Sequence, residues 1–216
     1  MPGYKTEPLN VPVVSGLLPE NERNRRVALT SFVPRPEKPQ VPKREVVCYE
    51  CGMRSQVPAV ALSANCVHCH AHLKMTDVDL KPGAQRLTVR TLGNVTIQPD
   101  AVLSQLSVVC NNCTLYGRGS GTYRCSGTLR VSSNNRIEGS VQATRMLVDK
   151  STDVVLTQGV TTNELEVNGR LTGRIIANKS IVIHRGGELY GDCYTPSLHV
   201  ENGGIHHGQW HNVIPD

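Results

Sequence analysis

The sequence predicts an all-β protein built around a triangular β-solenoid, and three observations support this. From about Gln85 onward, short runs rich in β-branched residues alternate with Gly, Asn and Ser, without helical periodicity. Apolar residues recur in this region about every 17 residues. Aromatic residues make up only 4% of the 216 residues, with one Phe and one Trp. A helical bundle normally uses such rings in its core, whereas a narrow coil has little room for them.

Three sets of apolar residues carry the repeat, and each is expected to form one inward-facing column. The sets are Leu147, Leu165, Ile181 and Leu198; Ile137, Val155, Leu171, Leu189 and Ile205; and Cys125, Val141, Val160, Ile175 and Cys193. A coil of this length accommodates three short strands and three corners, and successive coils stack at about 4.8 Å. We expect about five turns between Cys125 and Gln209, and one or two less regular turns before them.

The less regular turns span Gln85 to Arg124, and their expected inward residues are Val95, Ile97, Val102, Leu103, Leu106, Val108 and Leu115. Glycine is expected at one corner, where positive φ or close packing is needed. The corner glycines are Gly117, Gly139, Gly173, Gly191 and Gly208.

The segment 173–192 resembles the repeat of the bactofilin family. It opens with Gly173-Arg174-Ile175-Ile176-Ala177, continues through an apolar strand, turns at Gly186-Gly187 and reaches Gly191. The next turn repeats this order, and the resemblance covers about residues 125–210 but is weak over 85–124. The resemblance implies a right-handed β-helix flanked by flexible termini. Because bactofilins are bacterial cytoskeletal proteins, it also implies end-to-end polymerisation that needs no nucleotide.

Two pairs of cysteines precede the repeat. Cys48 and Cys51, then Cys66 and Cys69, form a C-x2-C pattern repeated after fourteen intervening residues. Two such corners facing each other give four thiolates in the tetrahedral arrangement that suits Zn²⁺. A module of about 30 residues needs such a metal to fold. We therefore expect a zinc ribbon with one structural Zn²⁺ per chain, and a β-hairpin between Arg54 and Asn65. The ribbon departs from the commonest bactofilin layout, which leaves open whether this chain polymerises in the usual way.

Other residues near these cysteines leave alternatives open. His68 or His70 could replace one cysteine ligand, or they are exposed polar residues, as is His72.

Cys110-Asn111-Asn112-Cys113 is a third C-x2-C, with Cys125 twelve residues later. It offers a second metal site, or a turn next to small inward hydrophobic residues.

The chain is thus expected to have four segments. These are a disordered Pro-rich arm over residues 1–45, the zinc ribbon over 46–80, the β-helix over 85–210 and a short tail over 211–216. The arm has a net charge of +3 and is a solvated tether, or else it docks on a protein partner or a membrane surface through Phe32 and Val33. The sequence shows neither a secretory signal pattern nor an apolar run long enough to span a bilayer, so we expect a cytoplasmic protein, with the membrane periphery as an alternative.

The expected function is that of a non-enzymatic scaffold. The open ends of a solenoid present unpaired backbone groups, so Ile205, Trp210, Val213 and Ile214 are expected to form either a cap or a self-association interface. No catalytic residue is assigned, because Glu164, Glu166, His184 and His199 fit outward strand positions. The alternative is a zinc-ribbon adaptor for nucleic acid or protein on a non-polymerising solenoid. Nucleic acid is disfavoured, because the net charge of +5 is spread out and Tyr49 is the only aromatic residue of the ribbon.

Overall fold

The computed structural model describes residues 41–84 and 88–214, and these residues form strands, turns and bends but no helix. The all-β prediction is therefore confirmed. None of the described residues lies in a helix that could cross a membrane. Most of the expected arm, including Phe32 and Val33, lies outside the described residues. The first strand begins at Lys43, so the last three residues of the expected arm belong to this strand.

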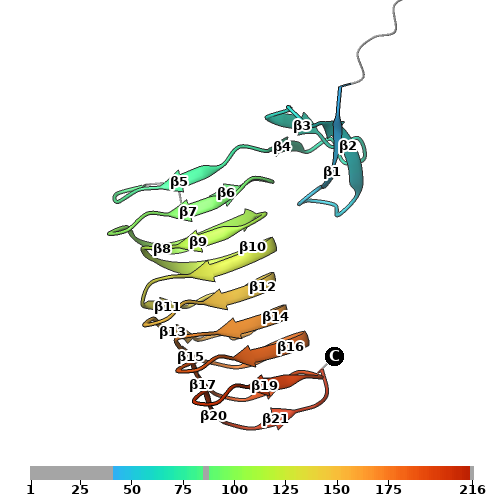
Figure 1. Ribbon diagram of the computed structural model, residues 1–216. Helices are drawn as coiled ribbons and strands as arrows, with labels where there is room; N and C mark the ends of the chain where they lie inside the picture. The colour runs from blue at the N-terminus through green and yellow to red at the C-terminus, as the bar shows by residue number, and fades with distance from the viewer. Residues whose placement is uncertain (1–40, 85–87, 215–216) are drawn as a thin grey trace, which may run out of the picture. The chain divides into compact units, whose positions relative to one another are not determined.

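The solenoid consists of parallel strands stacked turn upon turn (Figure 1). Its strands are β5 (Val78–Leu80), β6 (Thr88–Arg90), β7 (Val95–Ile97), β8 (Val102–Cys110), β9 (Cys113–Leu115), β10 (Arg118–Val131), β11 (Asn135–Ile137), β12 (Val141–Val148), β13 (Asp153–Leu156), β14 (Val160–Val167), β15 (Arg170–Thr172), β16 (Ile175–Ile183), β17 (Glu188–Tyr190), β18 (Cys193–Tyr194), β19 (Leu198–Val200), β20 (Ile205–His207) and β21 (Trp210–His211). Each pairs in parallel with the strand one turn away, so every turn contacts only its neighbours.

One face of the solenoid has a segment from each turn, and these segments give eight turns within the described residues. They are β5, β7, β9, the end of β10, the ends of β12, β14 and β16, and β19. The sequence predicted six or seven turns, because β5 lies inside the segment expected to be ribbon. The first turn therefore follows the cysteine module with almost no intervening linker.

The first predicted column is correct in three of its four members. Met146, not Leu147, pairs with Leu165, and the column continues through Ile181 to Leu198. Met146 is fully buried, whereas Leu147 pairs with Glu166 and points outward, half-buried. Successive side chains of a strand point to opposite faces of the sheet. Where two adjacent residues are both apolar, a register error of one residue therefore assigns the outward residue to the core.

The second and third columns need similar corrections. Val154 rather than Val155 lies in line with Leu171 and Leu189, and His206 rather than Ile205 continues that line. Ile137 is buried and pairs instead with Leu156. In the third column, Tyr123 rather than Cys125 pairs with Val141, and Cys125 pairs with Ala143.

The column through Cys125 lies at a corner and contains only small residues. It passes from Cys110 to Cys125, Ala143, Thr162 and Ala177. The core cluster to which this column belongs is otherwise made mainly of Val, Leu and Ile side chains.

Two details of the irregular N-terminal turns also differ from the prediction. Of the seven residues expected to face inward there, six are buried, but Val102 is 72% exposed at the start of β8. At the glycine corner, Gly208 stacks on Gly191 and Gly191 on Gly173, and in an earlier turn Gly139 stacks on Gly121. Gly117 lies at a different corner, against Gln98 and Ala101.

Before the solenoid, four antiparallel strands form a small module. They are β1 (Lys43–Val47), β2 (Arg54–Pro58), β3 (Ser63–Asn65) and β4 (His72–Lys74). β1 pairs with β2, and β3 pairs with β4. The hairpin expected between Arg54 and Asn65 is absent from this described segment, because its two strands each pair with a flanking strand instead.

Candidate metal centre

Each cysteine pair lies in the turn of its own hairpin. Cys48 and Cys51 occupy the turn between β1 and β2, and Cys66 and Cys69 the turn between β3 and β4. The two turns have matching backbone hydrogen bonds: the Gly52 N–H donates to the Cys48 carbonyl at 2.9 Å, and the N–H four residues after Cys66 donates to its carbonyl at 3.0 Å. Both turns therefore present their two thiols in the same way.

The four thiols converge on one point. All four Sγ atoms lie within 4.8 Å of one another. Across the two turns, the Sγ atoms of Cys48 and Cys69 are 3.7 Å apart, as are those of Cys51 and Cys66. A tetrahedral ion with metal–sulfur bonds of about 2.3 Å separates its ligands by about 3.8 Å. The sulfur spacing thus fits a single four-coordinate metal ion.

Backbone groups favour the thiolate form at this site. The N–H groups of Cys69 and His68 point at the Cys66 thiol and lower its pKa to about 6. The Glu50 N–H likewise lies 3.4 Å from Cys48 Sγ. Because a thiolate, not a thiol, binds a metal ion, such N–H groups prepare the cysteines for coordination.

The nearby histidines lie outside the sulfur cluster. His68, His70 and His72 are exposed, and His72 Nδ1 is 3.2 Å from Asn65 Oδ1. His70 has a backbone role: its φ of 60° matches the 72° of Gly52, which has the equivalent position in the first turn. The candidate ligand set therefore consists of the four cysteines without a histidine.

The module has only a small apolar core. Val46, Val57, Leu73 and Met75 are buried together with Cys48 and Cys66. The Tyr49 hydroxyl donates to the His72 carbonyl at 2.6 Å and so links the two hairpins. Burial of these few apolar side chains cannot offset the conformational entropy that the module loses on folding. A bound metal ion would therefore be needed to stabilise the folded module.

The module is joined to the first solenoid turns by specific contacts. Leu92, at a corner after β6, packs against the module's core, and its N–H donates to the Lys74 carbonyl at 2.7 Å. Arg90 forms an ion pair with Glu50. The cysteine module and the solenoid therefore form one continuous structural unit.

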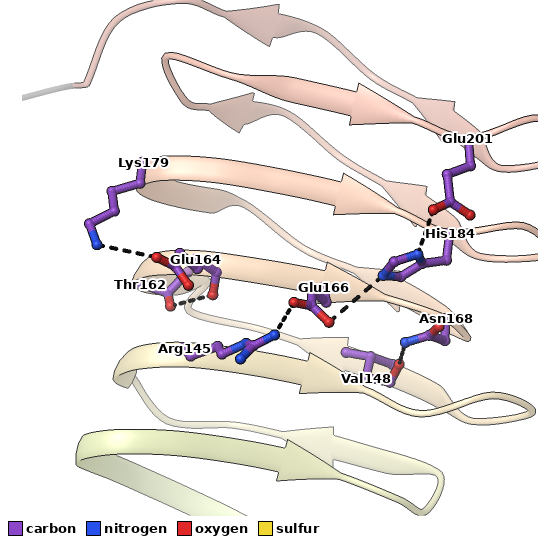
Figure 2. Close-up of polar contacts among 9 residues, drawn as sticks. All are labelled: Arg145, Val148, Thr162, Glu164, Glu166, Asn168, Lys179, His184 and Glu201. Carbon is purple, nitrogen blue, oxygen red and sulfur yellow. Dashed lines mark hydrogen bonds and ion pairs between the residues drawn. The ribbon is translucent and has the colours of Figure 1, made fainter.

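A ladder of charged side chains runs across the outer surface of four turns (Figure 2). Glu166 forms an ion pair with Arg145, and its other oxygen is 3.7 Å from His184 Nε2. His184 Nδ1 is 2.9 Å from Glu201 Oε1. The hydrogen bond from His184, together with one from the Arg185 N–H, lowers the pKa of Glu201.

Glu164 belongs to a separate ion pair, with Lys179 at 3.2 Å. Glu164 and Glu166 share the outer face, as the sequence predicted, but each is engaged by its own partners from neighbouring turns. The ladder thus links turns to one another, in line with a structural role.

The last turn differs from the interior turns in its exposure. Leu198, His206 and Trp210 continue the three inward columns and form the last layer of side chains. Trp210 is 49% exposed, although its column partner Cys193 is fully buried. The Trp210 Nε1–H donates to the Thr195 carbonyl at 3.0 Å, which holds the indole in place.

Of the four residues predicted for this end, Ile205, Val213 and Ile214 are also exposed. Around the rim, Tyr190 stacks on His207 and Tyr194 on His211, with ring centroids 4.7 and 4.5 Å apart.

These features define a class of protein: a parallel β-solenoid that presents an apolar end, preceded by a four-cysteine module. Residues 151–211 match the family model Bactofilin, described as polymer-forming cytoskeletal. The search of curated proteins and the search of solved structures returned no match. The C-terminal turns of the solenoid are therefore similar to the bactofilin family, whose model covers residues 151–211 of this chain. The match spans β13 to β21, the most regular turns.

Proposed function

We propose that this chain is a non-enzymatic scaffold whose β-solenoid associates end to end into nucleotide-independent filaments. The observation that carries the proposal is the exposed last turn. Val200, Ile205, Trp210, Val213 and Ile214 are all 40% exposed or more. The partners of Val200 and Trp210 one turn back, Ile183 and Cys193, are by contrast fully buried. Burial of such side chains against a second copy would remove apolar area from water at about 25 cal/mol per Å².

Backbone geometry supports the same association. Among the described residues, β19, β20 and β21 pair with the preceding turn only, so their outer edge offers free N–H and C=O groups. Such an edge is a template for another strand. A contact between unlike ends that does not close on itself generates a filament. The family description, polymer-forming cytoskeletal, agrees with this outcome.

For the cysteine module, we propose one structural Zn²⁺ bound by Cys48, Cys51, Cys66 and Cys69. Four thiolates close the coordination sphere and leave no position for a reactive water, which fits a structural role. The module also exposes Val60, Leu62 and Val67 by 69–77%. These side chains support a second function for the module, as a docking surface for a protein partner.

Electron microscopy and sedimentation of the full-length chain test the filament proposal. Val213→Lys places a charge in the exposed last turn and is expected to shift the protein from filaments to short species. The matched control is Val102→Lys, which alters an equally exposed valine on the side of the solenoid and should leave filaments intact. A uniformly monomeric wild-type protein at several ionic strengths would contradict the proposal, as would equal effects of the two substitutions.

Elemental analysis tests the metal assignment. The wild-type chain should contain about one zinc ion, and the double variant Cys48→Ser, Cys66→Ser should contain none. Cys193→Ala, which changes a buried cysteine of the solenoid, serves as the control and should retain the metal. A full zinc content in the double variant would refute the assignment.

A further inference from the structure

Three thiols meet at one corner inside the solenoid, away from the candidate metal centre. Cys110 ends β8, Cys113 begins β9 and Cys125 lies within β10. All three are buried, with exposures of 3%, 0% and 4%. Cys110 and Cys125 are direct register partners on neighbouring turns, and their Sγ atoms are 3.6 Å apart.

The backbone at this corner suits a covalent link between turns. Paired parallel strands lie about 4.8 Å apart, which is within the Cα separations of about 4.4–6.8 Å that disulfides adopt. The pairing of β10 with β12 changes register between Cys125 and Thr128, so the chain is locally irregular where movement would be needed. A change of side-chain rotamer can then bring the two sulfurs into bonding distance.

The surroundings favour a neutral product over a metal–thiolate complex. Tyr123, two residues before Cys125, is fully buried, and desolvation raises its pKa far above the usual range. No charged side chain among the described residues is buried, so nothing in the interior would balance several thiolates. A disulfide carries no charge and avoids this cost.

A small reagent can approach Cys125 from outside. This residue lines a surface hollow of about 250 Å³, together with Gln142, Ala143, Thr162 and Asn163 among others. Hydrogen bonds from Cys110 and Cys113 lower the pKa of Cys125 to about 5. Of the three cysteines, Cys125 is the one that lines this hollow, and its lowered pKa favours the thiolate that attacks a disulfide reagent.

We propose that Cys110 and Cys125 form a reversible disulfide that links two turns of the solenoid, with a small-molecule disulfide as the oxidant. The Cys125 thiolate attacks one sulfur of the oxidant, which forms a mixed disulfide and releases one thiolate. Cys110 loses its proton to that thiolate and attacks the Cys125 sulfur, which forms the Cys110–Cys125 bond and releases a second thiolate. The two cysteines lose two electrons, and the oxidant is reduced to one thiol, which carries the Cys110 proton, and one thiolate, which takes a proton from water.

Peptide mapping of the full-length, zinc-loaded chain tests this proposal. The protein is incubated with oxidised glutathione, alkylated and digested with trypsin without reduction. Trypsin places Cys110 and Cys113 in the peptide 91–118 and Cys125 in the peptide 125–130, apart from the four cysteines of the metal centre. The expected result is a cross-linked pair of these two peptides that becomes their main form and disappears on reduction.

Two variants assign the partner of Cys125. Cys113→Ala should retain the cross-link, whereas Cys110→Ala should lose it. The proposal is overturned if the wild-type peptides stay separate, if the main product is a bond between Cys110 and Cys113 within one peptide, or if Cys110→Ala cross-links as well as wild type. The peptide map of the wild-type chain can overturn the proposal without either variant. The proposal therefore remains testable even if a variant fails to fold.

Discussion

Stacking of glycine on glycine at one corner gives a quantitative prediction. At Gly191, φ is +125°, and an added Cβ would lie 2.2 Å from the Gly173 carbonyl oxygen. Gly191→Ala therefore combines backbone strain of about 1–3 kcal/mol with an overlap that costs about 1–3 kcal/mol. The smaller conformational freedom of the unfolded chain offsets about 0.4–1 kcal/mol. We expect a net loss of about 3 kcal/mol in the stability of the turn.

Two matched substitutions separate the contributions. Gly186 also has a positive φ, +81°, but an added Cβ would have nothing within 4 Å, so Gly186→Ala carries strain alone and should cost about 1 kcal/mol. Gly139 lacks the positive φ, yet an added Cβ would lie 2.4 Å from the Gly121 carbonyl oxygen. Gly139→Ala therefore tests the overlap by itself, and we expect a cost of about 1–2 kcal/mol.

The single tryptophan supplies the assay. Trp210 lies in the last turn, and its fluorescence during urea unfolding reports that turn, while far-ultraviolet circular dichroism reports all strands. Because turns contact only their neighbours, Gly191→Ala should move the fluorescence transition to lower urea than the dichroism transition. Equal fluorescence shifts for Gly191→Ala and Gly186→Ala would refute the stacking argument.

Three further predictions concern the metal centre and the outer ladder. Removal of the metal with a strong chelator should abolish hydrogen-exchange protection in β1–β4 but leave β12–β16 protected; loss of protection in both regions would contradict a locally stabilising metal. His70→Gly should stabilise the zinc-loaded module by about 1 kcal/mol, because its φ of 60° matches that of Gly52, and a lower resistance to chelator would oppose this reasoning. The pKa of Glu201 is lowered in the folded chain, so its contribution to stability is present above the ordinary carboxyl range and is lost as pH falls through the folded value. Acid should therefore loosen the last turn less in Glu201→Gln than in wild type, as judged by Trp210 fluorescence, whereas Glu138→Gln, at an exposed ion pair, should follow wild type.

The sequence predicted the solenoid because its period survives small slips, but it could not fix the face of each residue. Adjacent apolar pairs such as Met146-Leu147 and Val154-Val155 satisfy the period equally well, and only strand pairing separates them. The first turn was missed because β5 is three residues long and follows the cysteine module directly.

The candidate metal centre was the more predictable feature, because its C-x2-C pairs set the local geometry. The sequence did not predict which strands pair to position the two cysteine turns. The pairing of β1 with β2 and of β3 with β4 depends on which strands meet in space. The cluster of Cys110, Cys113 and Cys125 depends in the same way on the stacking of turns: Cys125 is twelve residues from Cys113 in the chain but lies at the same corner.

The parallel stacking of turns has a consequence for how assemblies of this protein would look in diffraction. Strands run across the solenoid axis, so an end-to-end filament would give a strong meridional reflection at about 4.8 Å, the same spacing that cross-β fibrils show. It would lack the reflection at about 10 Å that arises from flat sheets packed face to face, because three faces enclose one core here. The equatorial pattern, rather than the meridional one, would therefore distinguish a native filament from an aggregate.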